Sequence, residues 1–351
     1  MTKPIGKPEV VQPYSIKNLP PLIVGGAVFN TQYSEDPHSL PVPELIQTAF
    51  DNGLNALDTS PYYGPSEEII GKALKKITYP RETYYICTKA GRIRLNEFDY
   101  SRSHVRMSVE RSLKRLGTAY LDLVYMHDIE FVEEDEIYEA LKELKLLKNE
   151  GKIRNFGITG YPVNFLYKIA LGAKQNPEIG PLDAILSYSN GCLQNIRLFA
   201  YYDKFINECG IQKLINGSIL SMSLLRSDKT HDFHPAPQEL KDTVYDIAQK
   251  LLKEDNVEMA DLATRFAVKE WLFNTTSQSD THDLKPNPNV GIALGMTDVK
   301  ELKSAIDNYW EIKQDLNNIN EKDAILVKKV QDLLGDKHFN EIWPSGIPNR
   351  D

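Results

Sequence analysis

Eight short apolar segments recur along this 351-residue chain, with helical patterns between them. Most of the eight are nearly continuous in apolar and β-branched residues, which is typical of parallel strands buried on both faces. They cover residues 22–29, 54–60, 84–90, 120–128, 152–160, 183–189, 212–220 and 289–296. Strand and helix alternating eight times predict an α/β fold in which the sheet closes into a (β/α)₈ TIM barrel.

Two of the helical stretches show their pattern most clearly. Residues 136–151 carry one apolar face and end at Gly151, a residue suited to a helix C-terminus. That face is made by Ile137, Ala140, Leu141, Leu144 and Leu147. The helix that ends at Gly117 has the same spacing, with Val105, Val109, Leu113 and Leu116. Helices of this kind are expected to cover the outside of the barrel.

The main competing fold is an open, doubly wound sheet, which would be expected to carry a glycine-rich dinucleotide-binding motif after an early strand. The chain has no GxGxxG and no P-loop. Length alone suggests two domains, but (β/α)₈ barrels exceed the usual domain size as one unit. We therefore expect a single domain over residues 1–351, with the barrel at about 20–335 and a tail at 336–351. The longest loops, near 221–237 and 275–288, have lengths typical of functional lids.

Composition excludes several classes of protein. The net charge of -8 and the lack of a basic stripe argue against nucleic-acid binding. The three cysteines form no CxxC pair, so neither a disulfide framework nor a metal site is indicated. No signal-peptide core opens the chain and no apolar run could span a bilayer. A cytoplasmic protein without membrane or nucleic-acid partners is the expectation.

Four side chains with possible catalytic roles stand at the ends of three successive predicted strands. Asp58 and Tyr63 follow the second strand, Lys89 ends the third and His127 ends the fourth. Each alone has a structural explanation: a turn cap, a loop phenol, a solvated lysine and a hydrogen-bonded histidine. Active sites of (β/α)₈ barrels lie at the carboxyl ends of the strands. Together the four therefore predict a site there.

These segments give the chain a resemblance to the aldo-keto reductases that covers most of its length. It is carried by LDTSPYYGPSE, TKAG, SLKRLGTAYLDLVYMHD and GKIRNFGITGYP. The resemblance implies a catalytic tetrad of Asp58, Tyr63, Lys89 and His127, and the five-residue spacing from Asp58 selects Tyr63 over Tyr62. The implied reaction is hydride transfer between a substrate carbon and a nicotinamide cofactor.

Elementary chemistry assigns a role to each member of the tetrad. A tyrosine has an ordinary pKa of about 10, too high for an efficient base near neutrality. An ammonium nearby stabilises phenolate, so Lys89 is expected to lower the pKa of Tyr63. Asp58 would neutralise and hold the half-buried lysine. His127 can donate a hydrogen bond to the substrate oxygen.

The cofactor is expected to be a diffusible hydride carrier, because no metal or covalent cofactor site is visible in the sequence. In the resemblance, Thr159 stands where the family has a serine that binds the carboxamide, and Gly160 where it has an asparagine. Ser218 stands where many relatives stack a residue on the nicotinamide. The expected cofactor-binding residues are Thr159, Gly160, Ser218, Leu220, Gly295, Met296, Thr297 and Glu301.

The cofactor is expected to be NAD, with NADP weaker. Relatives that prefer NADP have a lysine and an arginine where this chain has Gly295 and Glu301. A carboxylate repels the 2′-phosphate and can accept a hydrogen bond from a ribose hydroxyl. If the alignment with these relatives is shifted along the chain, Lys300 or Lys303 would instead stand beside the 2′-phosphate.

Within the family, VGGAVFNTQY, LSYSNGCLQN, NGSILSMSLLRS and HFNEIWPSGIP resemble the sugar 1-dehydrogenases. The implied reaction is oxidation of an aldose at C1, D-arabinose first, to its 1,4-lactone on a route to erythroascorbate. Tyr63 would accept the hydroxyl proton. Phe29, His127 and Trp343 are expected pocket walls, with core packing of Phe29 and docking of the tail through Trp343 as the alternatives.

Other functions remain open at this point. The same chemistry could serve L-galactose, L-fucose or L-xylose, and NADPH-dependent reduction of simple aldehydes is a further alternative. The barrel also occurs as a non-catalytic regulatory subunit beside potassium channels, which the intact tetrad disfavours. The protein is expected to be a monomer or a homodimer.

Overall fold

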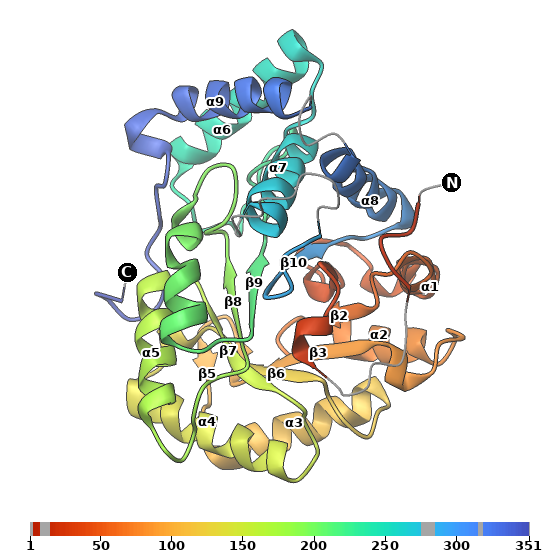
Figure 1. The fold of residues 1–351 in the computed structure, drawn as a ribbon, viewed down its shortest axis with the longest axis vertical. Helices are drawn as coiled ribbons and strands as arrows, with labels where there is room; N and C mark the ends of the chain where they lie inside the picture. The colour runs from red at the N-terminus through yellow and green to blue at the C-terminus, as the bar shows by residue number, and fades with distance from the viewer. Residues whose placement is uncertain (1–2, 8–14, 275–284, 315–318, 351) are drawn as a thin grey trace.

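The computed structural model describes residues 3–7, 15–274, 285–314 and 319–350. Eight parallel strands close into a barrel in the order β1-β10-β9-β8-β7-β6-β3-β2, at the centre of Figure 1. The barrel strands are Leu22–Gly25 (β1), Ala56–Asp58 (β2), Tyr85–Ala90 (β3), Leu123–Met126 (β6), Phe156–Gly160 (β7), Ala184–Tyr188 (β8), Lys213–Gly217 (β9) and Val290–Gly295 (β10). Each lies within one of the eight predicted segments, and the predicted (β/α)₈ barrel is confirmed.

Helices surround the barrel, with two departures from strict alternation. The helices are Val42–Asp51 (α1), Ser66–Leu74 (α2), Arg102–Leu116 (α3), Glu134–Asn149 (α4), Val163–Gln175 (α5), Gln238–Asp255 (α6), Met259–Ala267 (α7), Val299–Gln314 (α8) and Ile319–His338 (α9). Between β8 and β9 the chain forms short 3₁₀ and π turns at Arg197–Tyr201 and Lys204–Glu208. Two helices, α6 and α7, follow β9, and α9 packs against α6 outside the barrel (Figure 1).

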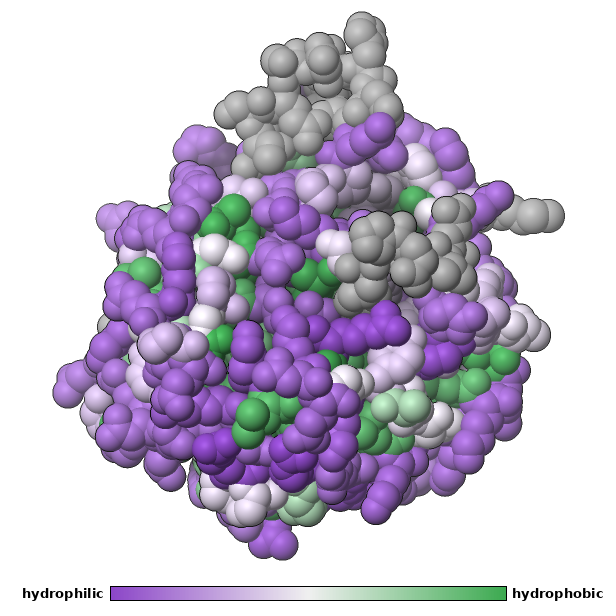
Figure 2. Space-filling view, turned by 60° about the horizontal axis from the view of Figure 1, so that its bottom comes forward, coloured by the Kyte–Doolittle hydropathy of each residue, from purple (hydrophilic) through white to green (hydrophobic). Residues whose placement is uncertain are grey.

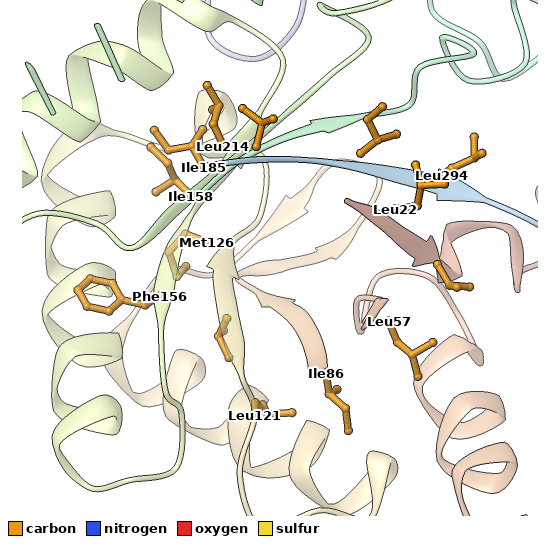
Figure 3. Packing of buried hydrophobic residues seen from close by; sticks show 14 of the residues in the cluster. Leu22, Leu57, Ile86, Leu121, Met126, Phe156, Ile158, Ile185, Leu214 and Leu294 are labelled. Atoms are coloured by element: carbon orange, nitrogen blue, oxygen red, sulfur yellow. The ribbon is translucent and has the colours of Figure 1, made fainter. Parts of the chain in front are cut away.

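The main hydrophobic core lies between the strands and the helices. Figure 3 shows strand residues of this layer, among them Leu57, Ile86, Ile158 and Ile185. The predicted apolar face of α4 is fully buried in the same core. Gly117 ends α3 in the left-handed region, with φ 67°, which a glycine adopts without steric strain. The predicted faces and stops of both helices are therefore confirmed.

The inside of the barrel is filled by side chains and closed at one end. The amino-terminal end of the barrel is covered by Ile16 and Leu19, which belong to the interior cluster. Lys213, at the start of β9, donates hydrogen bonds from Nζ to the carbonyl oxygens of Leu19 at 3.1 Å and Pro288 at 3.0 Å. A small molecule therefore has to approach from the carboxyl ends of the strands.

The outer surface in Figure 2 is mostly hydrophilic, with small separated apolar patches. Within the described ranges, every helix is too short or too polar to cross a membrane. A two-stranded hairpin, Arg92–Arg94 (β4) with Glu97–Phe98 (β5), follows β3 on the side of the barrel where the predicted tetrad lies.

Candidate active site

The four predicted catalytic residues come together at the carboxyl end of the barrel. Asp58 is the last residue of β2 and pairs in register with Cys87 of β3. Lys89 lies near the end of β3, and His127 follows β6 directly. Tyr63 lies in a turn in which its N–H bonds to the carbonyl of Ser60, just before α2 begins. Neighbouring parallel strands therefore place these side chains together.

Lys89 is the centre of the arrangement. Its Nζ donates to Asp58 Oδ1 at 2.5 Å and to the carbonyl oxygen of Thr59 at 3.0 Å. The side chains of Lys89 and Asp58 are only 2% and 9% exposed. The Nζ lies 4.8 Å from the centroid of the Tyr63 ring, and the ring of His127 meets Tyr63 edge-on at 5.6 Å. The geometry matches a buried ammonium held under a phenol.

Burial opposes the charge of Lys89, but Asp58 and Tyr63 together raise its pKa above the ordinary value. The lysine is therefore charged throughout the physiological range. The predicted effect of Lys89 is confirmed, because its charge lowers the pKa of Tyr63. Burial raises that pKa by more, so the pKa of Tyr63 lies above its ordinary value. Tyr63 is thus a neutral phenol at neutral pH, kept close to the cation that would stabilise its phenolate.

His127 is held by a residue that the sequence analysis missed. Its Nδ1 lies 3.0 Å from Ser60 Oγ, and Ser60 Oγ also accepts the backbone N–H of Tyr62 at 3.1 Å. The Ser60 hydroxyl can donate to Nδ1, and in that tautomer the ring hydrogen is on Nε2. Burial, with the charges of Lys89 and Arg92, holds the pKa of His127 well below its usual value. The neutral ring is then a donor through Nε2, which is the tautomer that the substrate role needs.

Gly160 stands in place of the family's asparagine for a packing reason. A Cβ at this position would lie 2.4 Å from Oε2 of Glu130, a fully buried carboxyl group that follows β6. Glu130 Oε1 accepts the N–H of Tyr161 and the hydroxyl of Ser345. Burial and the neighbouring Asp128 raise the pKa of Glu130 to about 8. Glu130 therefore fills the space that a larger residue 160 would need.

Some buried polar atoms near the ends of β8 and β9 have no hydrogen-bond partner within the described part of the chain, among them Ser189 Oγ, Gln194 Oε1 and Asn216 Oδ1. The register places Gly160 beside Ser187 and Ser187 beside Asn216, so these groups belong to one edge of the barrel mouth. Free acceptors here fit the amide hydrogens of a nicotinamide carboxamide. Gln194 and Asn216 lie in segments that resemble the sugar 1-dehydrogenases, but neither was predicted as a site residue.

The other predicted cofactor residues of this region are Thr159, Ser218 and Leu220. Thr159 lies in β7 with 1% exposure, in register with Leu186. Ser218 follows β9 with a left-handed φ of 54°, and its Oγ accepts the N–H of Met222 at 2.8 Å. Leu220 packs against the core. Contact of these residues with a cofactor stays a prediction.

The residues at the end of β10 and after it lie around the carboxylate of Glu301. Glu301 Oε2 accepts the N–H and hydroxyl of Thr297 at 2.7 and 2.9 Å, which holds it at the start of α8. Gly295 is exposed and Met296 is buried. Arg226, which the sequence analysis missed, has Nη2 at 3.9 Å from Glu301 Oε1. Arg226 also lines a cleft of about 690 Å³ beside the loop after β9.

The two remaining substrate residues are both buried. Phe29 is fully buried in the main core, as in the alternative of core packing, and its contact with a substrate stays a prediction. Trp343 is 2% exposed and stacks on Tyr161 with centroids 4.7 Å apart. The tail is fixed beside it, since Gln194 Nε2 donates to the carbonyl oxygens of His338 and Glu341. Most of the predicted 275–288 loop lies outside the described residues.

The closed barrel, with a tyrosine, a histidine and a buried lysine–aspartate pair at the carboxyl ends of its strands, defines a barrel oxidoreductase. The chain belongs to the aldo/keto reductase family, whose family model matches residues 21–326. Membership implies a nicotinamide cofactor.

The chain is similar over nearly its whole length to two proteins of known activity. It is 46% identical to D-arabinose 1-dehydrogenase of Saccharomyces cerevisiae, over 97% of this chain and 98% of that protein. It is 33% identical to L-galactose dehydrogenase of Arabidopsis thaliana, over 92% and 91%. Among solved structures, an aldo-keto reductase of Bacillus halodurans in its holo form has the same fold, with a TM-score of 0.61, 20% identity and coverage of 92% and 95%.

Proposed function

We propose that this protein oxidises an aldose, D-arabinose in first place, at C1 to the 1,4-lactone with NAD. The observation that carries the proposal is the buried Lys89–Asp58 pair beneath Tyr63, at the end of the barrel that a small molecule can reach. The choice of sugar is supported by the 46% identity to D-arabinose 1-dehydrogenase. The choice of NAD rests on Glu301, which faces Arg226 and would repel a 2′-phosphate.

In this reaction the C1 hydroxyl loses its proton to Tyr63 as the C1 hydrogen leaves as hydride. Bound NAD supplies the hydride acceptor. Lys89 stabilises the phenolate that accepts the proton, and Asp58 keeps that ammonium in place. His127 donates from Nε2 to the oxygen on C1, which orients the sugar. The ring oxygen remains bonded to C1, so the product is a lactone.

The proposal is tested by mixing the purified protein with D-arabinose and either NAD or NADP, and following nicotinamide absorbance. L-galactose, L-fucose, L-xylose and D-glucose serve as comparison sugars. We expect NADH to form fastest from D-arabinose and more slowly with NADP. Preference for L-galactose would move the assignment towards the activity of the plant relative. Activity only with NADPH and simple aldehydes would overturn the sugar and NAD assignments, and no turnover at all would favour a non-catalytic barrel.

The pH dependence of kcat/KM is expected to show the ionisation of Tyr63 and not that of His127. Because burial raises the pKa of Tyr63, the phenolate fraction grows throughout the neutral range, and log kcat/KM for oxidation should rise with a slope of about one. Reduction, which needs the phenol, should stay flat. Because the pKa of His127 is far below its usual value, neither profile should bend near pH 6.5. Initial rates from pH 5.5 to 9 check this, and a bend near 6.5 that disappears in His127→Gln would contradict it.

Glu301→Arg is expected to raise kcat/KM with NADP relative to NAD by about tenfold, the size of one charge-assisted hydrogen bond. The substitution removes a carboxylate beside Arg226 and adds a second cation. Asp307→Arg is the matched control, because Asp307 is exposed on the same helix and undergoes the same change of charge. An equal shift in both variants would show a general field effect, and no shift in Glu301→Arg would show that the register after β10 is wrong.

A further inference from the structure

A second buried ion pair adjoins the tetrad. Asp128 directly follows His127, and Arg92 begins the β4–β5 hairpin three residues after Lys89. Arg92 Nη1 donates to Asp128 Oδ2, and Arg92 Nη2 donates to the carbonyl oxygen of Leu95 at 3.0 Å. The side chains of Arg92 and Asp128 are only 11% and 4% exposed. The tetrad chemistry described above uses neither residue.

Aromatic rings hold this pair against the catalytic histidine. The Arg92 guanidinium lies 4.1 Å from the centroid of Tyr62, and within 5.5 Å of the rings of Phe98 and Phe131, which stack on each other. The Tyr62 ring in turn meets His127 edge-on at 5.7 Å. Asp128 Oδ2 is 3.6 Å from His127 Nε2, the atom assigned to bind the substrate oxygen. A substrate held by His127 therefore has the pair as an immediate neighbour.

The pair is poorly explained by stability alone. A buried ion pair often stabilises a fold no more than apolar residues of the same size would. Asp128 has a left-handed φ of 56°, a conformation that aspartate and asparagine adopt more often than other residues with a side chain. Arg92 Nε is buried and has no hydrogen-bond partner among the described residues. A desolvated ion pair with an unused donor therefore needs an explanation beyond packing.

We propose that Arg92 and Asp128 recognise the hydroxyl group at C2 of the sugar. This inference rests on the proposed aldose oxidation and names the group by which the sugar is selected. Apart from the ring oxygen, which cannot donate, the C2 hydroxyl is the polar group nearest to the C1 oxygen that His127 binds. The Asp128 carboxylate accepts its hydrogen, and Arg92 holds that carboxylate in place through its bond to Oδ2. A simple aldehyde lacks this hydroxyl and gains nothing from the pair.

The test compares D-arabinose with 2-deoxy-D-arabinose in the wild type and in Asp128→Asn. Asparagine keeps the shape and readily adopts the left-handed conformation, and its amide oxygen can still accept from Arg92. Because Arg92 loses its counter-charge, urea unfolding of the variant is measured alongside its activity. We expect the wild type to prefer D-arabinose by about 30-fold in kcat/KM, as for a hydrogen bond to a charged group. Asp128→Asn should lose about tenfold with D-arabinose, mainly through a higher KM. With the deoxy sugar it should lose less than about threefold.

Two controls separate recognition from a structural role. Arg94→Met removes an arginine from the same short strand, where its side chain is 81% exposed and pairs only with Glu97 among the described residues. Arg94→Met should leave kcat/KM unchanged for both sugars. Reduction of benzaldehyde with NADH should lose no more in Asp128→Asn than oxidation of the deoxy sugar does, because neither substrate carries a C2 hydroxyl.

The outcomes distinguish this inference from the proposed function. Equal losses of Asp128→Asn with both sugars, or a wild type that does not discriminate between them, would overturn the role of the pair while the oxidation of aldoses stands. A wild type that oxidises no sugar but reduces benzaldehyde would overturn the proposed function, and the inference with it. A selective loss with D-arabinose alone supports the inference.

Discussion

Tyr63→Phe is expected to lower kcat for D-arabinose oxidation by about 10³-fold, the usual size of a lost general acid–base group. Phenylalanine keeps the ring that faces Lys89 and His127 and removes only the hydroxyl oxygen. Cofactor affinity should therefore change by less than about threefold, because binding of the cofactor involves no proton transfer to or from Tyr63. Steady-state rates, with NADH binding followed by fluorescence titration, separate the two effects.

Tyr62→Phe is the matched control for this prediction. It removes the same hydroxyl group from the neighbouring tyrosine, which the five-residue spacing from Asp58 does not select. Tyr62 contacts His127 and Arg92 through its ring, and the ring survives the substitution. We expect a loss of less than about tenfold. The reverse order, with Tyr62→Phe the inactive variant, would show that the five-residue spacing from Asp58 selects the wrong tyrosine. Normal turnover of Tyr63→Phe would refute the mechanism.

Lys89→Met is expected to affect both stability and activity. It leaves Asp58 buried without its cation, a change that typically lowers the free energy of unfolding by about 3–5 kcal/mol. The double variant Asp58→Asn, Lys89→Met removes both charges and should recover most of that loss. Activity should not recover, because the phenolate of Tyr63 has lost its stabilising charge. Urea unfolding and turnover of the two single variants and the double variant complete the cycle.

Lys213→Met provides the comparison for a buried lysine without a catalytic neighbour. Lys213 lies at the opposite end of the barrel, bonded to backbone carbonyl oxygens, and burial lowers its pKa to about 7. This variant should keep wild-type turnover at saturating substrate. If the double variant of Asp58 and Lys89 regained turnover together with stability, the Lys89–Asp58 pair would have a structural role only. Loss of turnover in Lys213→Met would point to a general sensitivity of the barrel.

The barrel and the tetrad could be predicted because their signals are local. Each strand is a short apolar run, each clear helix has one apolar face, and Gly117 and Gly151 mark helix ends. Asp58 and Tyr63 are close in sequence, and the rule that barrel sites lie at strand ends brought Lys89 and His127 to them. Phe29 shows the limit of this reasoning. A residue near a strand end can face the outer core instead of the mouth, and sequence position does not distinguish the two.

The sequence by itself determined where the strands and helices form and which chemical groups stand at the strand ends, because apolar periodicity and spacing depend on neighbours along the chain. Only the tertiary structure decided the environment of those groups. The raised pKa of Tyr63 results from the balance of burial against Lys89, and Ser60 Oγ lies within hydrogen-bond distance of His127 Nδ1. The contact between Glu130 and Gly160 likewise joins groups on different loops and strands. Such effects depend on distances of a few ångströms between segments that only folding brings together.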